Sequence, residues 1–323
     1  PALIAETLHQ SNPILDDIPW VASNMATGHR STIRTGLPTV HLRRLDSGVA
    51  PSRSTTANIT DGMSILEAWS TTDIKNYIGC KTPAAKRELR MSEAEAFVEA
   101  MGQKMAELIF YGSVLDDDKE FNGLKVRYDT LTGNVATNVI SCNDTTNDNS
   151  QTSMWLIGWA PGKIHGIYPP GSTAGLAHKD WGEQVVVNPS GSGYDGERMA
   201  AYQDQWMWDG GLVVKDWRYA VRICNIDISD LRAITETQAV TNTGKAILYQ
   251  MARAIRRIPN LQACRPVFYC TRQVAEAFDV MTTYLANSNI TQAKDANGAP
   301  STSFRGVPIK VCDQLLDTET VVS

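Results

Sequence analysis

The strongest regular pattern of hydrophobic and polar positions lies between residues 92 and 111. Apolar side chains recur there every three or four residues, at Phe97, Met101, Met105, Leu108 and Ile109. This spacing places them on one face of an amphipathic helix. Ser92-Glu93-Ala94-Glu95 forms a capping box before the first of them, and Gly112 is a suitable C-terminal stop. We therefore predict a helix over residues 92–111 whose apolar stripe faces the core.

After this helix, the pattern becomes that of a β-rich segment from residue 154 to 226. A half-buried strand is predicted where apolar and polar positions alternate, with Trp217, Tyr219, Val221 and Ile223 on one face and Arg218, Ala220 and Arg222 on the other. Short apolar runs predict further strands at 266–270 and 306–312, and helical spacing predicts helices at 244–258 and 271–285. We expect a turn entering a strand at 121–124 and an exposed loop at 141–153. These elements predict an α+β fold with long irregular connections.

Residues 1–60 do not have the pattern of a domain. They contain five prolines, long polar runs and only short apolar patches, such as Ile18-Pro19-Trp20, without helical periodicity after about residue 10. Stretches of this length without structure of their own are uncommon inside a compact domain. We expect this segment to lie extended over the rest of the subunit or over a neighbouring one.

Composition narrows the class of protein. The chain has 323 residues, 42% of them hydrophobic and 20% charged, with a formal net charge of −5. These values indicate a globular protein and exclude a strongly basic, histone-like chain. No secretory signal is visible, and no apolar run approaches the length of about 20 residues that a membrane helix needs. The six cysteines are scattered without a CxxC pair, which favours reduced thiols in a protein made in the cytoplasm.

The basic residues of the N-terminal segment are all arginines. Between residues 28 and 53 the arginines are Arg30, Arg34, Arg43, Arg44 and Arg53, against one acid, Asp46, and the first lysine of the chain is Lys75. Arginine suits bidentate pairing with carboxylate or phosphate. A solvated basic loop, an arm that pairs with acidic surface on another copy, and a nucleic-acid contact all remain open. The acidic run Asp116, Asp117, Asp118 and Glu120 is a candidate partner, although a solvated turn is the simpler interpretation.

No group of residues indicates catalysis, a cofactor or a metal. Residues 191–196 match GxGxxG, but three residues separate them from the preceding apolar run, whereas a phosphate-binding turn leaves its strand directly. Thr243-Gly244-Lys245 lacks the first glycine and the magnesium-binding hydroxyl of a phosphate loop. The five histidines are isolated in sequence, and we expect each to be a surface or hydrogen-bonded residue. We therefore predict no enzyme, no cofactor and no metal.

The layout resembles the major capsid proteins of short-tailed double-stranded DNA bacteriophages, in the broad family that shares the HK97-type capsid fold. The resemblance lies in four stretches: the arm with Ile18-Pro19-Trp20 and the arginines after it; the helix 92–111 leading to Phe121-Asn122-Gly123-Leu124; residues 208–219; and Val267–Arg272 with Gly306–Ile309. The family implies an arm at 1–30, an extended loop at 31–75, a peripheral domain at 76–130 and 300–323 with the spine helix, and an axial domain at 131–299 containing the Trp-rich β-segment.

The family also implies function and partners. We expect a major capsid protein that forms the hexamers and pentamers of an icosahedral shell around phage double-stranded DNA, made in the host cytoplasm and located in the virion. Portal, scaffolding and separate cementing proteins are expected partners, and a membrane is not. Some family members cross-link their shells through a lysine on the extended loop, which residues 1–74 cannot supply. The alternative is a soluble enzyme or ligand-binding protein with its site in the Trp-rich block 155–217.

Overall fold

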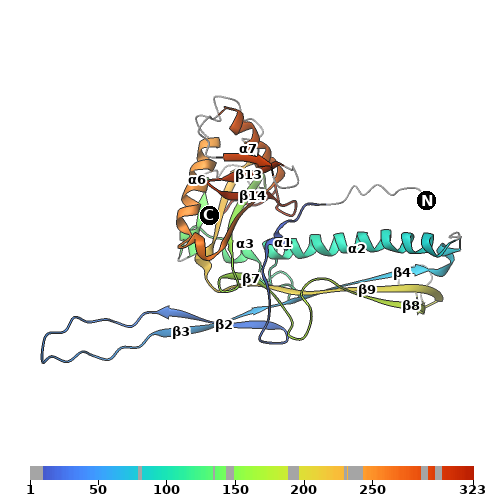
Figure 1. Cartoon of the computed structure of the whole chain (residues 1–323), viewed down its shortest axis with the longest axis horizontal. Coiled ribbons are helices and arrows are strands. Elements are labelled where there is room, and N and C mark those ends of the chain that lie inside the picture. Colours follow the sequence, from blue (N-terminus) through green and yellow to red (C-terminus); the bar gives the residue numbers. More distant parts are fainter. Residues whose placement is uncertain are drawn as a thin grey trace.

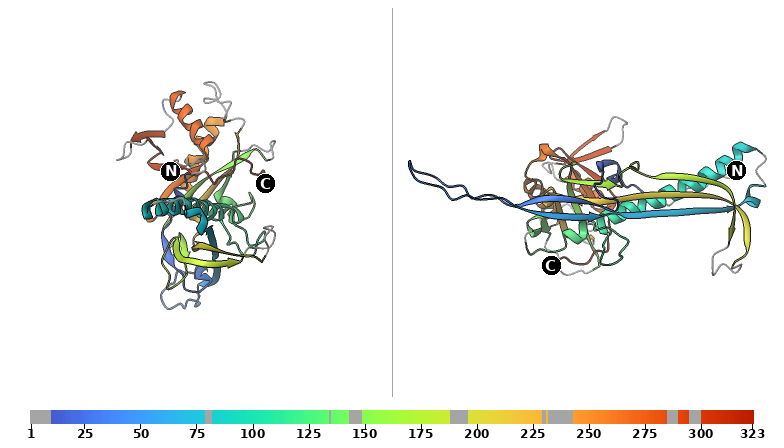
Figure 2. Two further views of the ribbon diagram at one scale, coloured as in Figure 1. Left: turned by 90° about the vertical axis from the view of Figure 1, so that its right-hand side faces the viewer. Right: turned by 90° about the horizontal axis from the view of Figure 1, so that it is seen from below.

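The computed structural model shows a central body from which two long extensions project (Figure 1). Seen from below, they point in opposite directions, a thin hairpin on one side and a helix lying along a β-sheet on the other (Figure 2). The residues that the structure describes are 10–78, 82–133, 135–142, 149–187, 196–228, 231, 243–284, 290–294 and 300–323. The predicted glycine-rich loop at 191–196 lies outside them except for Gly196.

The body is built on a mixed sheet around β6 (Gln151–Trp159), which pairs antiparallel with β10 (Ala220–Asp227) on one side and β11 (Arg265–Cys270) on the other. From β11 the sheet continues through β14 (Val307–Val311), β13 (Pro300–Phe304) and β12 (Ile290–Lys294). β5 (Val139–Ser141) lies parallel to β10. Every residue of β6 and β10 is buried, so these two strands form the centre of the core.

Two amphipathic helices pack on the body, α6 (Thr243–Arg257) and α7 (Arg272–Tyr284). Their apolar faces enter the core through side chains such as Met251 and Phe278, both fully buried. The predictions of these helices and of the strands β11 and β14 are confirmed to within about two residues. The helix segments were predictable because each has a single apolar stripe at helical spacing.

The long extension consists of α2 (Pro83–Tyr111) lying on β4 (Ser64–Asp73), β9 (Arg198–Val214) and β8 (Ala177–Val187). Phe97 of the helix stacks on Trp206 of β9, with ring centroids 4.6 Å apart. β9 continues into the body, where it pairs with β7 (Ile164–Tyr168), and β1 (Trp20–Ala22) completes that edge. One continuous strand therefore joins the extension to the body.

The predicted start of the long helix is wrong, whereas its end is confirmed. The helix begins nine residues earlier, where Thr82 accepts a hydrogen bond from the Ala85 amide and Pro83 takes the first turn. Ser92 lies inside the helix and donates to the Leu89 carbonyl at 3.2 Å. Residues 83–91 favour a helix, but Lys86 and Arg90 occupy the positions that would continue the apolar stripe, so the stripe did not reveal them.

Three other local expectations need correction. Residues 124–127 form a short helix, α3 (Leu124–Arg127), rather than the start of a strand. Residues 151–153 are fully buried at the beginning of β6, although we expected an exposed loop throughout 141–153. Arg222 is fully buried on β10, because this strand is covered on both faces. Trp217 and Tyr219 lie in a 3-10 turn, η3 (Trp217–Tyr219), before the strand begins.

Shorter elements are α1 (Ile14–Asp17), η1 (Ile74–Tyr77), η2 (Val135–Asn138) and η4 (Leu261–Ala263).

Candidate assembly surfaces

The thin extension is an antiparallel hairpin of β2 (Gly28–Gly36) and β3 (Thr55–Gly62), joined by residues 37–54 at its tip. The tip exposes large apolar side chains, with Leu37, Val40, Leu42 and Leu45 between 82% and 105% exposed. The hairpin projects away from the body (Figure 1), and no other described residue covers these side chains. Apolar side chains in such a row are characteristic of a surface that another protein covers.

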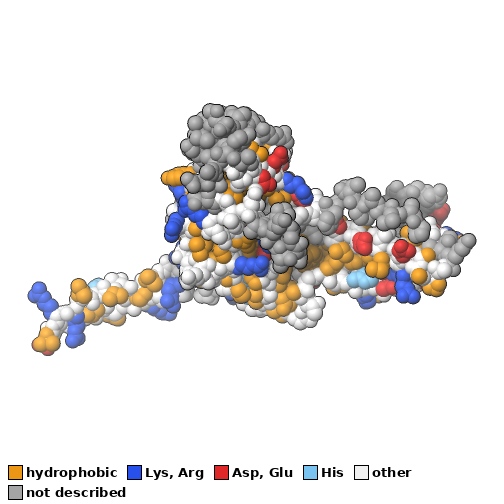
Figure 3. All heavy atoms as spheres, turned by 45° about the horizontal axis from the view of Figure 1, so that its top comes forward, with side chains coloured by type: hydrophobic (Ala, Val, Ile, Leu, Met, Phe, Trp, Pro, Cys, Tyr) orange, Lys and Arg blue, Asp and Glu red, His pale blue; other side chains and the backbone are white. Residues whose placement is uncertain are grey.

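All five arginines predicted as contact residues lie on this hairpin and are exposed. Arg30 and Arg34 belong to β2, and Arg43, Arg44 and Arg53 belong to the tip. Within the described residues, none of the five forms an ion pair. The surface view shows basic and apolar side chains alternating along the hairpin (Figure 3). The hairpin therefore presents both kinds of group to a partner outside the subunit.

The acidic run forms a turn beside the end of α2. Asp116, Asp117 and Asp118 are exposed, and the pKa of Asp117 is lowered because its carboxylate accepts the Lys119 amide at 3.0 Å. Glu120 is half-buried and has partners within the subunit, since it accepts the Ser113 amide at 3.1 Å and lies 3.4 Å from the Lys104 ammonium. The structure thus leaves the three aspartates available to a neighbour, whereas Glu120 also holds its own turn.

Two histidines that are isolated in sequence meet at the base of the hairpin. His29 of β2 and His165 of β7 are buried edge to face, with ring centroids 6.0 Å apart. Burial lowers the pKa of both rings, and the nearby Lys215 ammonium lowers it further, to about 4 for His165. Asp61, opposite His29 in the hairpin, is engaged by Arg127 at 2.8 Å. Our expectation that each histidine is a surface or hydrogen-bonded residue is wrong for His165, because neither ring nitrogen has a hydrogen-bond partner among the described residues.

A second buried group fastens the N-terminal segment to the body. The Asp17 carboxylate at the end of α1 accepts the Lys310 ammonium at 2.7 and 2.8 Å and the Tyr269 hydroxyl at 2.8 Å. Arg265 approaches the same carboxylate at 2.9 Å. The Asp17 side chain is almost fully buried, so these contacts hold α1 against β11 and β14.

The C-terminal segment is held by a fully buried ion pair between Arg222 and Glu319, 2.8 Å apart. Tyr111 of α2 donates to the other oxygen of Glu319 at 2.7 Å, and Ser153 of β6 also donates to Glu319. Arg222 in addition donates to the Tyr128 carbonyl at 2.8 Å. The group links α2, the central sheet and the C-terminal segment.

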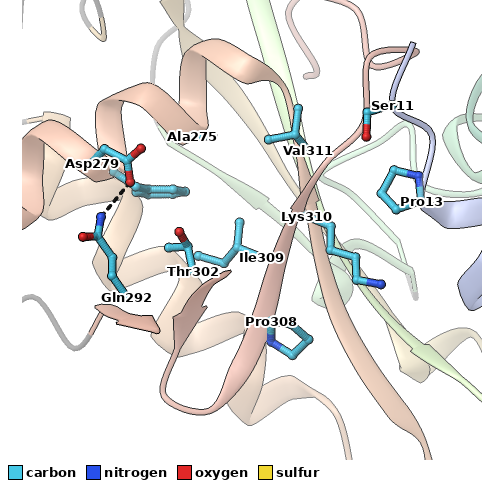
Figure 4. A pocket seen from close by; sticks show the side chains of 11 residues that line it. Ser11, Pro13, Ala275, Asp279, Gln292, Thr302, Pro308, Ile309, Lys310 and Val311 are labelled. Atoms are coloured by element: carbon cyan, nitrogen blue, oxygen red, sulfur yellow. Dashed lines mark hydrogen bonds between the residues drawn. The ribbon is translucent and has the colours of Figure 1, made fainter. Parts of the chain in front are cut away.

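The tryptophans of the block 155–217 do not converge on one ligand site. Trp155 is fully buried in the core, Trp206 stacks on Phe97, and Trp208 packs against Trp20. A cavity of about 590 Å³ lies elsewhere, between α7, β14 and the segment at Ser11 and Pro13 (Figure 4). Its polar lining includes Asp279, which accepts a hydrogen bond from Gln292. No cluster of possible metal ligands occurs among the described residues.

None of the helices in the described part of the chain is both long and apolar enough to cross a membrane.

The comparisons with known proteins agree with the resemblance to phage major capsid proteins. In the solved structure of bacteriophage Epsilon15, the matching chain is 26% identical, with a TM-score of 0.74, over 99% of this chain and 92% of that one. The bacteriophage JBD30 capsid matches at 11% identity and a TM-score of 0.49, over 96% and 93%. No curated protein matches.

The predicted α+β, HK97-like capsid fold is confirmed, and nothing supports the alternative of an enzyme with a site in the Trp-rich block. The role is that of a virion structural protein, whose copies form the capsid of a bacteriophage. The model of the family described as major capsid protein GP7 matches residues 1–323, and the chain therefore belongs to this family of phage major capsid proteins.

Proposed function

We propose that this subunit forms the hexamers and pentamers of an icosahedral shell around phage double-stranded DNA, and that its role is structural rather than enzymatic. One observation carries the proposal: the hairpin and the long extension project from the body and expose large apolar side chains, among them Leu37, Leu42 and Leu45 at the tip and Ile65 and Trp69 of β4. Apolar side chains gathered in this way are characteristic of surfaces that other proteins cover. Two arms that point in opposite directions suit a subunit that neighbours surround (Figure 2).

We further propose that the hairpin is a main contact between subunits. Its tip has exposed leucines that can be buried against a neighbour and exposed arginines that can pair with carboxylates. The turn at Asp116–Asp118 is the candidate acidic partner, because its side chains point into solvent and the hairpin arginines lack an ion pair within the described part of their own chain. Arginine and aspartate can form two parallel hydrogen bonds, which fixes the geometry of a contact as well as its strength.

The proposal is tested with the double variant Arg43→Ala/Arg44→Ala, compared with Arg87→Ala/Arg198→Ala, which removes two exposed arginines elsewhere. Assembly is followed by light scattering and electron microscopy at increasing salt. We expect the hairpin variant to give fewer shells and to lose them at lower salt, while the control behaves as the wild type. Unchanged yield and salt resistance of the hairpin variant would show that these arginines do not hold subunits together.

We propose that the shell is not covalently cross-linked and that a separate cementing protein reinforces it. The absence of lysine from residues 1–74 supports this, because the hairpin cannot then supply an amine for an isopeptide bond. Denaturing electrophoresis of purified virions is expected to show this subunit as a single band near 35 kDa, without a ladder of multiples. Portal and scaffolding proteins as partners, and synthesis in the host cytoplasm, are inferred from the family.

The division into domains is likewise a proposal. The hairpin at 28–62 corresponds to the extended loop expected at 31–75, and α2 corresponds to the spine helix of a peripheral domain. β8 and β9 lie along α2, which favours assigning them to the peripheral domain. The axial domain would then consist of the body with α6 and α7. The bounds expected from the family resemblance instead put residues 131–299, and so both strands, in the axial domain.

A further inference from the structure

A strongly basic segment runs from Thr243 to Ala275. It contains six basic residues and no acidic one, in a chain whose net charge is −5. Two of the six are neutralised within the subunit, since Arg265 pairs with Asp17 at 2.9 Å and Arg272 pairs with Asp313 at 2.6 Å. The side chain of Lys245 is not described. The remaining three, Arg253, Arg256 and Arg257, lie close together at the C-terminal end of α6.

These three arginines form no ion pair with any described residue. Arg253 donates to the Gln250 side chain at 2.9 Å, and Arg257 donates to the Val139 carbonyl at 3.4 Å; both acceptors are uncharged. Arg253 and Arg256 are exposed, and Arg257 is half-buried. The pKa of Arg257 is lowered by burial and by the charge of Arg253. The three charges thus repel one another without a carboxylate to offset them.

Aromatic side chains lie beside these charges. Tyr249, one turn earlier on α6, is 64% exposed, and the Arg253 guanidinium lies 5.8 Å from its ring centre. Arg257 also lines a hollow of about 400 Å³ together with Trp217 and Arg218, where Arg218 is paired with Asp216. The surface view shows basic side chains on the side of the body where Figure 1 places α6 (Figure 3).

We infer that this α6 arginine surface, formed by Arg253, Arg256 and Arg257 with Tyr249, binds the phosphate backbone of double-stranded DNA. The inference rests on the proposed function, because this surface can meet DNA only if the subunit belongs to a shell that encloses DNA and α6 faces the interior of that shell. Guanidinium groups pair bidentately with phosphate, and tyrosine side chains are among the groups that donate hydrogen bonds to phosphate oxygens of DNA. The three arginines span about 6 Å along the helix, and one DNA strand presents a phosphate every 3.4 Å or so of axis.

An acidic surface on another copy is the competing partner. The candidate acidic surface is the exposed turn at Asp116–Asp118. We have already proposed this turn as the partner of the five hairpin arginines. Tyr249 does not decide between the two, since a carboxylate accepts a tyrosine hydroxyl as a phosphate does. Charge favours DNA: three aspartates would have to serve five arginines of the hairpin and three of α6, whereas a duplex supplies phosphates to all three of α6.

The experiment measures binding of a 30-base-pair duplex to the full-length, unassembled subunit by fluorescence anisotropy over a range of NaCl concentrations. The triple variant Arg253→Gln/Arg256→Gln/Arg257→Gln is compared with Arg87→Gln/Lys119→Gln/Arg198→Gln, which removes the same charge at other exposed positions. The slope of log K against log salt is negative, and each lost phosphate contact makes it less steep by about 0.9. We expect the steepness to fall by about 2 to 3 in the α6 variant and by less than 1 in the control.

An equal loss in both variants would overturn the inference, because binding would then follow net charge alone. A triple variant that binds DNA normally but assembles poorly would also overturn it, in favour of a contact between copies. Sodium phosphate at matched ionic strength should displace the duplex no better than NaCl; specific displacement would indicate a single-anion pocket instead. Should the triple variant not fold, exposed Arg256→Gln alone is expected to lower the slope by about 1. Electron microscopy of wild-type shells tests the proposed function separately.

Discussion

Acidification should weaken the base of the hairpin, because two buried histidines face each other there. His29 and His165 are neutral at pH 7, and a proton added to either ring would be buried beside the other ring and near Lys215. Asp61 is the nearest acid, but Arg127 already engages it at 2.8 Å. The folded subunit therefore resists protonation that the unfolded chain accepts.

The magnitude follows from His165, whose pKa falls from 6.5 to about 4 on folding. A histidine whose pKa is lower in the folded state than in the unfolded state does not reduce the stability at pH values above its unfolded pKa. Stability is lost as the pH falls from 6.5 to 4, where only the unfolded chain takes up the proton. At about 1.4 kcal/mol per pKa unit, the full loss is about 3.5 kcal/mol, and about 2 kcal/mol of it has occurred at pH 5. His29 changes in the same direction.

Urea unfolding of the unassembled subunit, followed by tryptophan fluorescence at pH 7, 6 and 5, measures this loss. Carboxylates also contribute to the pH dependence, so the comparison is between variants. His165→Leu should lose about 2 kcal/mol less than the wild type between pH 7 and pH 5, whereas His41→Leu, at an exposed position of the hairpin tip, should match the wild type. Equal losses in His165→Leu and the wild type would refute the reasoning.

Three further predictions concern stability. Glu319→Gln leaves the buried Arg222 charge unpaired and should cost about 3 to 5 kcal/mol in urea unfolding, with a smaller loss when Arg222→Met is added. Asp17→Asn should speed hydrogen exchange of the β1 amides at least several-fold, with little change in β6, because it weakens the attachment of α1. Gly166→Ala places a methyl group 2.6 Å from the Trp20 ring and should cost about 1 to 3 kcal/mol by thermal unfolding, whereas Gly162→Ala, with open space around it, should be nearly neutral.

Elements whose stability comes from one apolar face could be predicted from the sequence. α6, α7 and the C-terminal end of α2 each have such a face, so their periodicity was visible. The hairpin was not predictable as paired strands, because β3 is exposed at nearly every position and has no alternation of apolar and polar residues. It pairs with β2 along its whole length, but a strand that is mostly polar on both faces carries little side-chain pattern from which that register could be predicted.

The candidate contact residues were predictable only where composition revealed them. The hairpin arginines stood out because lysine is absent around them. His29 and His165 are 136 positions apart, and Arg222 and Glu319 are 97 positions apart, so no local signal could join them. Arg222 was placed on a polar face because its neighbours alternate, whereas β10 is covered on both sides. Burial of a charge depends on a partner brought by the tertiary fold, which a periodic pattern does not contain.

The charged residues fall into two groups: buried ion pairs that stabilise the folded subunit, and exposed arginines that are available to bind partners. Asp17 and Glu319 are buried and each neutralises basic groups of the body; the Arg222–Glu319 pair is buried on both sides and is shielded from salt, and the pair of Asp17 with Lys310 is partly shielded. The exposed arginines of the hairpin and of α6 have no such partner within the described residues, and pairs that they form outside will weaken as salt rises. The leucines of the hairpin tip respond in the opposite way, because apolar burial does not depend on charge screening. Salt should therefore loosen contacts between subunits and to DNA well before it affects the fold, and the apolar part of each hairpin contact should outlast its arginines.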